Sequence, residues 1–149
     1  MPVLLLSLLL MISSDRHVDV SFRSGALLVC GTYSGASPHL VVLALNCGGK
    51  SVYFSHGQQD SNFRVKVTDN KHQECEFTDK GLSFFAGGGG FVDELRPAGA
   101  LFANFGLNDF FKLPSSEPCT ATVDAIYDRP PYHSSVVVHG RVLLSGARK

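Results

Sequence analysis

The feature that most constrains this fold is a series of short apolar or alternating runs separated by turn residues. In the clearest run, NFRVKV, Phe63, Val65 and Val67 are predicted to face one side of a strand, while Arg64 and Lys66 face water. No long stretch has the 3.6-residue period of a helix. Turn signals spaced about 8 to 12 residues apart are typical of antiparallel architectures. The pattern therefore predicts an all-β fold, either an antiparallel β-sandwich or a partly closed β-barrel.

Other strands follow from the same pattern. VDVSF and ALLVC, with Gly25 between them, predict one bulged strand or two short ones. LVVLALNC is expected to be a buried strand that ends at Cys47, with SVYFSH as its hairpin partner across the tight turn CGGK. TATVDAIY and SVVVHGRVLL complete the predicted strands. Between them lies a long irregular Gly/Phe-rich segment, in which 86–99 is a possible flexible loop and FVDEL one helical turn.

Length and charge narrow the classes of function. The 149 residues fit a single domain, and 13 basic residues balance 13 acidic ones. This balance argues against a strong electrostatic partner such as a nucleic acid or an anionic membrane surface. An apolar content of 44% with 17% charged residues is typical of a packed globular domain.

The chain opens with an apolar run from Val3 to Ile12, in which Ser7 is the only polar residue. This run has the length of a signal-peptide core and is too short to span a bilayer; the alternative is a buried N-terminal strand. We expect a signal peptide at 1–14, followed by a single disulfide-braced β domain at 15–149. No second segment has transmembrane length, so the expected product is secreted and extracellular, with no membrane span.

The four cysteines are Cys30, Cys47, Cys75 and Cys119, and all lie in the predicted mature chain. In an oxidising compartment an even number of cysteines predicts two disulfide bonds. Three pairings are possible, and counting does not separate them.

No motif indicates catalysis or a metal site. His72 and Cys75 form an isolated H-x-x-C, which lacks the further ligands that zinc needs. G-x-S-x-G does not occur, and AGGGGF lacks the Lys of a phosphate loop. The carboxylates Asp93, Glu94 and Asp109 are expected to be solvated loop charges rather than a glycosidase pair. We therefore predict no catalytic residue, no cofactor and no metal.

Phenylalanines gather in one irregular third of the chain, and most are expected to be core residues. Some of them could instead line a surface for a partner or a glycan. The possible binding patch consists of Phe91, Phe102, Phe105 and Phe110.

Four stretches, in order, resemble the olive-pollen-allergen/extensin family of secreted plant proteins: LLVC, HLVVLALNC, DSNFRVKV with HQEC, and DFFKLPSSEPC. The family usually has six cysteines, and the two absent here bond to each other in it. The resemblance implies a β-barrel or sandwich with a non-enzymatic role in the extracellular matrix or at the pollen surface. It also implies the pairs Cys47 with Cys75 and Cys30 with Cys119.

The sequence thus favours a secreted, non-enzymatic binding or structural protein with a protein or polysaccharide partner and no nucleic acid. One alternative is an immunoglobulin-like or transthyretin-like interaction protein, including a pathogen effector. Another is a small secreted hydrolase. The oligomeric state stays open at this point.

Overall fold

The computed structural model of the chain describes residues 18–34, 38–55, 63–85, 92–114, 118–129 and 134–144. The predicted signal peptide and the Gly-rich residues 86–91 lie outside them. The described elements are β1 (Val18–Arg23), β2 (Ala26–Ser34), β3 (Pro38–Asn46), β4 (Val52–Ser55), β5 (Phe63–Thr68), α2 (Asp79–Phe85), β6 (Val92–Leu95), β7 (Ala100–Gly106), α3 (Leu107–Phe110), β8 (Cys119–Arg129) and β9 (Ser134–Leu144).

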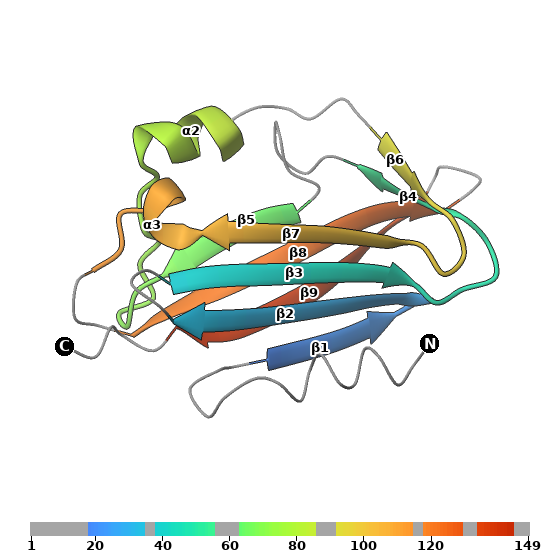
Figure 1. Ribbon diagram of the computed structural model, residues 1–149, viewed down its shortest axis with the longest axis horizontal. Helices are drawn as coiled ribbons and strands as arrows, with labels where there is room; N and C mark the ends of the chain where they lie inside the picture. Colours follow the sequence, from blue (N-terminus) through green and yellow to red (C-terminus); the bar gives the residue numbers. More distant parts are fainter. Residues whose placement is uncertain are drawn as a thin grey trace.

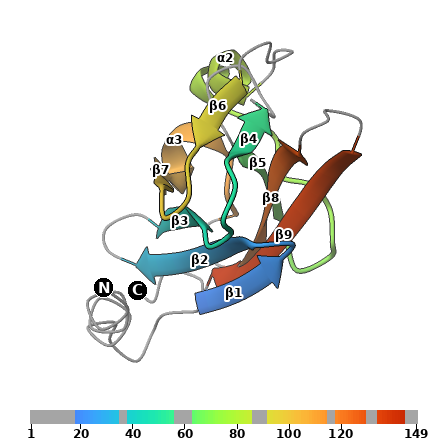
Figure 2. The ribbon, with the colours of Figure 1, turned by 90° about the vertical axis from the view of Figure 1, so that its right-hand side faces the viewer.

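The strands form two antiparallel sheets that face each other, as Figures 1 and 2 show. The four-stranded sheet has the order β1-β2-β3-β7. In the five-stranded sheet, one edge of β8 pairs with β9 along its whole length. The other edge of β8 pairs first with β5 and then with β4, and β6 pairs with β4. The predicted all-β sandwich is confirmed, and the sheets do not close into a barrel.

Alternation places the core between the sheets. Phe63, Val65 and Val67 are almost completely buried, while Arg64 and Lys66 are exposed, as the sequence predicted. Even-numbered residues of β2 and β3, such as Leu28 and Val42, meet them from the opposite sheet. Side chains that alternate across a pleated strand therefore give one continuous apolar layer.

The first two strands form a hairpin rather than one bulged strand. Ser24 and Gly25 both have positive φ, at 55° and 88°. A two-residue turn with positive φ at both positions matches the twist of antiparallel strands. It sets the register in which Arg23 pairs with Ala26.

Two local predictions were wrong. SVYFSH is not the hairpin partner of β3, because β4 lies in the other sheet, where it pairs with β6 and β8. FVDEL does not make a helical turn, since Val92–Leu95 is strand β6 inside the segment predicted as a possible loop. Both strands are only four residues long, and pairing with neighbours, rather than local pattern, selects them.

Asn46 holds together two of the connections that cross between the sheets. Its side-chain amide donates to the carbonyls of Lys50 and Leu95, both at 2.8 Å, and accepts a bond from the Gly48 amide at 2.9 Å. Its backbone amide and carbonyl bond with Gly99 and Ala98. Asn46 is only 1% exposed, so this buried polar residue is fully satisfied at the point where β3 leads to β4 and β6 leads to β7.

The two short helices lie at one end of the sandwich, on the left in Figure 1. Helix α2 was not predicted. Gly81 lets α2 approach α3, because a Cβ on Gly81 would clash with the Phe110 carbonyl oxygen. Aromatic rings fill the space around the helices at centroid separations of 4.9 to 6.3 Å, and they belong to Phe77, Phe84, Phe85, Phe105, Phe110 and Phe111.

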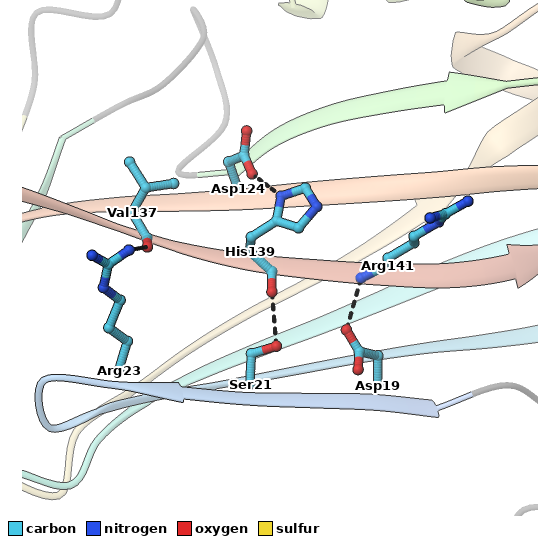
Figure 3. A network of polar contacts seen from close by, with 7 residues as sticks. All are labelled: Asp19, Ser21, Arg23, Asp124, Val137, His139 and Arg141. Atoms are coloured by element: carbon cyan, nitrogen blue, oxygen red, sulfur yellow. Dashed lines mark hydrogen bonds and ion pairs between the residues drawn. The ribbon is translucent and has the colours of Figure 1, made fainter. Parts of the chain in front are cut away.

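Side chains of β1 close the sandwich against the outer edge of β9, as Figure 3 shows. Ser21 Oγ donates to the His139 carbonyl at 2.7 Å, and Arg23 donates to the Val137 carbonyl at 3.2 Å. Asp19 Oδ2 accepts a bond from the Arg141 amide at 2.8 Å. Alternate side chains of one strand thus satisfy alternate backbone groups of the other. We call this contact the side-chain seam.

Candidate interaction surface

Three registered rows of residues form most of the outer face of the four-stranded sheet, and the next row along the strands contains His39. Directly paired residues in antiparallel strands point to the same face, so the strand register defines each row. One row consists of Val20, Val29, Leu43 and Phe102; the next of Phe22, Leu27, Leu45 and Ala100; and the third of Val18, Gly31, Val41 and Asn104. We call these twelve positions the apolar face. Asn104 is its only polar residue.

The apolar face is accessible at its two edges and partly accessible at its centre. Phe102 on β7 is 67% exposed, and Phe22 and Val20 on β1 are 64% and 55% exposed. The residues of β2 and β3 between them are partly exposed. Exposed aromatic side chains at this level are uncommon on a solvated sheet, and a contiguous group of them indicates a contact surface.

The corresponding face of the five-stranded sheet has the opposite character. Its rows include Arg64, Asp124 and His139 side by side, followed by Lys66 and Arg141. His139 Nδ1 lies 2.5 Å from Asp124 Oδ1. Polar residues normally occupy the outer face of both sheets in an isolated sandwich. Among the described residues, the outer face of the five-stranded sheet is largely polar and that of the four-stranded sheet is not.

The predicted Phe patch is not one surface. Phe105 and Phe110 are 4% and 9% exposed and belong to the aromatic cluster of the core. Phe102 is on the apolar face, and Phe91 lies outside the described residues. The sequence reasoning missed the other members of the face. The sequence does indicate this face, because ALLV and LVVLAL are apolar at both odd and even positions. A strand with one face in water is apolar at only one of these two sets of positions.

All four cysteines lie in the described residues, and no two of them are joined by a disulfide bond in the structure. Cys30 is fully buried, and burial, with a smaller contribution from the nearby Asp19 carboxylate, raises the pKa of its thiol to about 12. A Cβ on Gly140 would lie 2.6 Å from the Cys30 Sγ, which is closer than normal packing allows. Cys30 therefore serves as a packing residue between β2 and β9.

The structure does not bring together the cysteine pairs implied by the family resemblance. Cys30 contacts Gly140, while Cys119 is opposite Leu144, four residues or about 13 Å further along β9. Cys47 follows the end of β3, at the other end of the sandwich from the connection between β5 and α2 that contains Cys75 (Figure 1).

Cys75 and Cys119 are the pair that the fold places in contact, through a hydrogen bond between their side chains. Burial is the largest cause that raises the pKa of the Cys75 thiol. The bond with Cys119 lowers the pKa, and the Asp69 carboxylate raises it. These effects favour the neutral thiol at Cys75.

The carboxylates considered for hydrolysis have other partners. Glu94 Oε1 accepts a bond from Ser51 Oγ at 2.7 Å, and Asp109 forms an ion pair with Lys80 at 2.9 Å. They lie on β6 and α3, in different parts of the fold. The side chain of Asp93 lies outside the described set. Glu94 and Asp109 therefore do not form a pair.

A hollow of about 340 Å³ lies beside the β3–β4 connection and includes Asn46, Gly49, Lys50 and Ser51. Gly-Lys-Ser also occurs in phosphate loops, where a helix begins directly afterwards and its amides hold the phosphate. Here strand β4 follows, and Asn46 in the hollow is fully used in structural hydrogen bonds. The connection therefore has a structural role.

Within the described ranges, no three His, Cys, Asp or Glu side chains are grouped as metal ligands. The same part of the chain has no helix of the length and apolarity needed to cross a membrane. No protein-family model matches the chain, and no curated protein matches its sequence.

Proposed function

We propose that this chain is a secreted, non-enzymatic binding protein and that the apolar face is its contact surface. The observation that carries the proposal is the row of Val20, Val29, Leu43 and Phe102, which spans the whole sheet with side chains directed away from the core. Covering such a surface is favourable by roughly 25 cal/mol per Å² of apolar area removed from water. The apolar run near the N-terminus, Val3 to Ile12, supports export.

The chemistry of the face favours a protein partner over a polysaccharide. Sugar hydroxyls that leave water need hydrogen-bonding groups in the binding site. Asn104 is the only polar side chain among the twelve positions, and it already contacts His39 Nδ1 at 3.2 Å. A partner with its own apolar surface matches the face better, because neither side then loses hydrogen bonds to water.

Two experiments test the two parts of the proposal. For export, the full chain is expressed in cultured eukaryotic cells, and mass spectrometry of the medium is expected to find a mature N-terminus directly after Ser14. Retention of the uncut chain inside the cells would contradict secretion.

For the contact surface, a photo-crosslinking phenylalanine analogue replaces Phe102, and in a matched variant it replaces Leu143, which is 43% exposed on the other sheet. Protein adducts are expected at position 102 and not at position 143. Co-sedimentation of the wild type with cellulose or pectin, lost in Phe102→Ala, would overturn the choice of a protein partner. Equal crosslinking at both positions would overturn the choice of face.

A further inference from the structure

We infer that the partner of the apolar face is a second copy of the same chain, packed face to face about a two-fold axis parallel to the strands. This inference rests on the proposed function and names its partner. A two-fold interface brings one surface against itself, so that surface must be complementary to its own copy. Charge, shape and area each support this.

Charge is the first requirement for self-association. Two copies of a charged patch repel each other, and an unpaired charge that becomes buried costs much of the binding energy. The apolar face has no Asp, Glu, Lys or Arg among its twelve positions. The chain as a whole has 13 basic and 13 acidic residues, so the two copies also lack long-range repulsion.

The strand register determines which side chains of the two copies meet across the interface. A two-fold axis parallel to the strands and central to the sheet places β1 of one copy over β7 of the other, and β2 over β3. Phe22 then lies over Ala100, because these residues are at the two ends of one row. In the next row, Phe102 lies over Val20. Each large ring at an edge of the sheet thus meets a smaller side chain, which is the large-to-small packing of sheet interfaces.

The area of the apolar face suits the centre of a dimer interface. Five residues along each strand and four strands across give a rectangle of about 17 by 19 Å, or roughly 320 Å² in projection. A standard interface buries about 800 Å² per partner, with an apolar centre inside a polar rim. The face provides that apolar centre.

Sedimentation equilibrium of the purified chain at micromolar concentrations tests the inference. The wild type is expected to have twice the monomer mass. Val20→Lys and Phe102→Lys are each expected to weaken the dimer roughly 100-fold or more, since each buries two charges per dimer. Leu82→Lys and Leu143→Lys are matched controls, because these leucines are 49% and 43% exposed but lie outside the apolar face. The controls are expected to remain dimeric, and all four variants are expected to give the circular-dichroism spectrum of the folded wild type.

Cysteine crosslinking tests the orientation. In a Cys47→Ser background, the double variant Val20→Cys/Phe102→Cys is expected to give a covalent dimer with a short bismaleimide, because position 102 of one copy faces position 20 of the other across the roughly 10 Å that separates packed sheets. Leu82→Cys/Leu143→Cys is the control and is expected to stay monomeric on a denaturing gel.

The outcomes separate this inference from the proposed function. A monomeric wild type, or a dimer that Leu143→Lys breaks and Phe102→Lys does not, would overturn the inference. If the monomer still crosslinks another protein through position 102, the proposed function stands and only the choice of partner is wrong. Binding of the monomer to phosphatidylcholine vesicles through the same residues would overturn both the second copy and the protein partner.

Discussion

Cys30 and Gly140 approach so closely that a methyl group on Gly140 would lie 2.6 Å from the Cys30 sulfur. Cys30 is fully buried on β2, and Gly140 is on β9, so this contact fixes the distance between the two sheets beside the side-chain seam. Interiors are packed to crystal-like density, and an added methyl group must displace something.

Gly140→Ala is therefore expected to lower the free energy of unfolding by about 1–3 kcal/mol, the usual cost of overpacking. Chemical denaturation measures the change. Gly49→Ala is the control, because nothing lies within 4 Å of the position of its Cβ. The double variant Cys30→Ala/Gly140→Ala should have a higher free energy of unfolding than Cys30→Ala, because the added methyl group fills space that the sulfur leaves. Additive effects of the two substitutions would show that the contact is not the cause.

Asn46→Ala is expected to destabilise the fold by at least about 1–3 kcal/mol, since it leaves the buried Leu95 carbonyl without its side-chain donor. It also removes the two side-chain bonds, with Lys50 and Gly48, that fix the β3–β4 connection. Thermal unfolding followed by circular dichroism measures the effect. The control, Asn108→Ala, changes an exposed residue of α3 and should stay within about 0.5 kcal/mol of wild type. Equal melting temperatures for the two variants would contradict the role of Asn46.

Because the pKa of the Cys30 thiol is raised in the folded protein, we expect a loss of stability at alkaline pH. Its pKa is about 12 in the folded protein against 9.0 for an ordinary thiol, so between these values the unfolded chain loses a proton that the folded protein retains. The contribution is fully present below pH 9 and is lost as pH rises towards 12. Unfolding free energies measured across this window should fall more steeply in wild type than in Cys30→Ala, by up to about 1.4 kcal/mol per pH unit. Parallel curves would exclude this linkage.

Reactivity of the thiols should follow their burial. With iodoacetamide at neutral pH, Cys47 is expected to react first because it is exposed, followed by the half-buried Cys75. Cys30 and Cys119 are buried and should react only after unfolding. Peptide mapping by mass spectrometry gives the order, and the denatured protein, in which all four should react alike, is the control. Recovery of Cys47 and Cys75 in one disulfide-linked peptide would instead support the pairing implied by the family resemblance.

Strands with a clean alternation were predictable from the sequence. In NFRVKV the apolar residues Phe63, Val65 and Val67 are buried, and in TATVDAIY the alternating residues Ala121, Val123 and Ala125 are buried. LVVLALN was correctly predicted as a strand, but its continuous apolar character concealed which residues face out. Leu43 and Leu45 are partly exposed, while Val42 and Ala44 are core.

Elements chosen by tertiary contact were not predictable. Helix α2 is seven residues long and contains Gly81, which weakens a helix by about 1 kcal/mol relative to Ala. Its helical form depends on the approach to α3 that only glycine permits. The placement of β4 in the second sheet depends on its pairing with β6 and β8, strands that lie far along the sequence. No local pattern carries that information.

The side-chain seam limits which strands can bind along the outer edge of β9. Where two strands join through main-chain bonds, nearly any sequence can take the place of either one, and this tolerance is how exposed edges recruit foreign chains. Along β9, the outer carbonyls of Val137 and His139 and the amide of Arg141 are instead occupied by a guanidinium, a hydroxyl and a carboxylate at alternate positions of β1. Another segment would need those three groups in the same order to bind this edge of β9, so the edge selects for the sequence of β1.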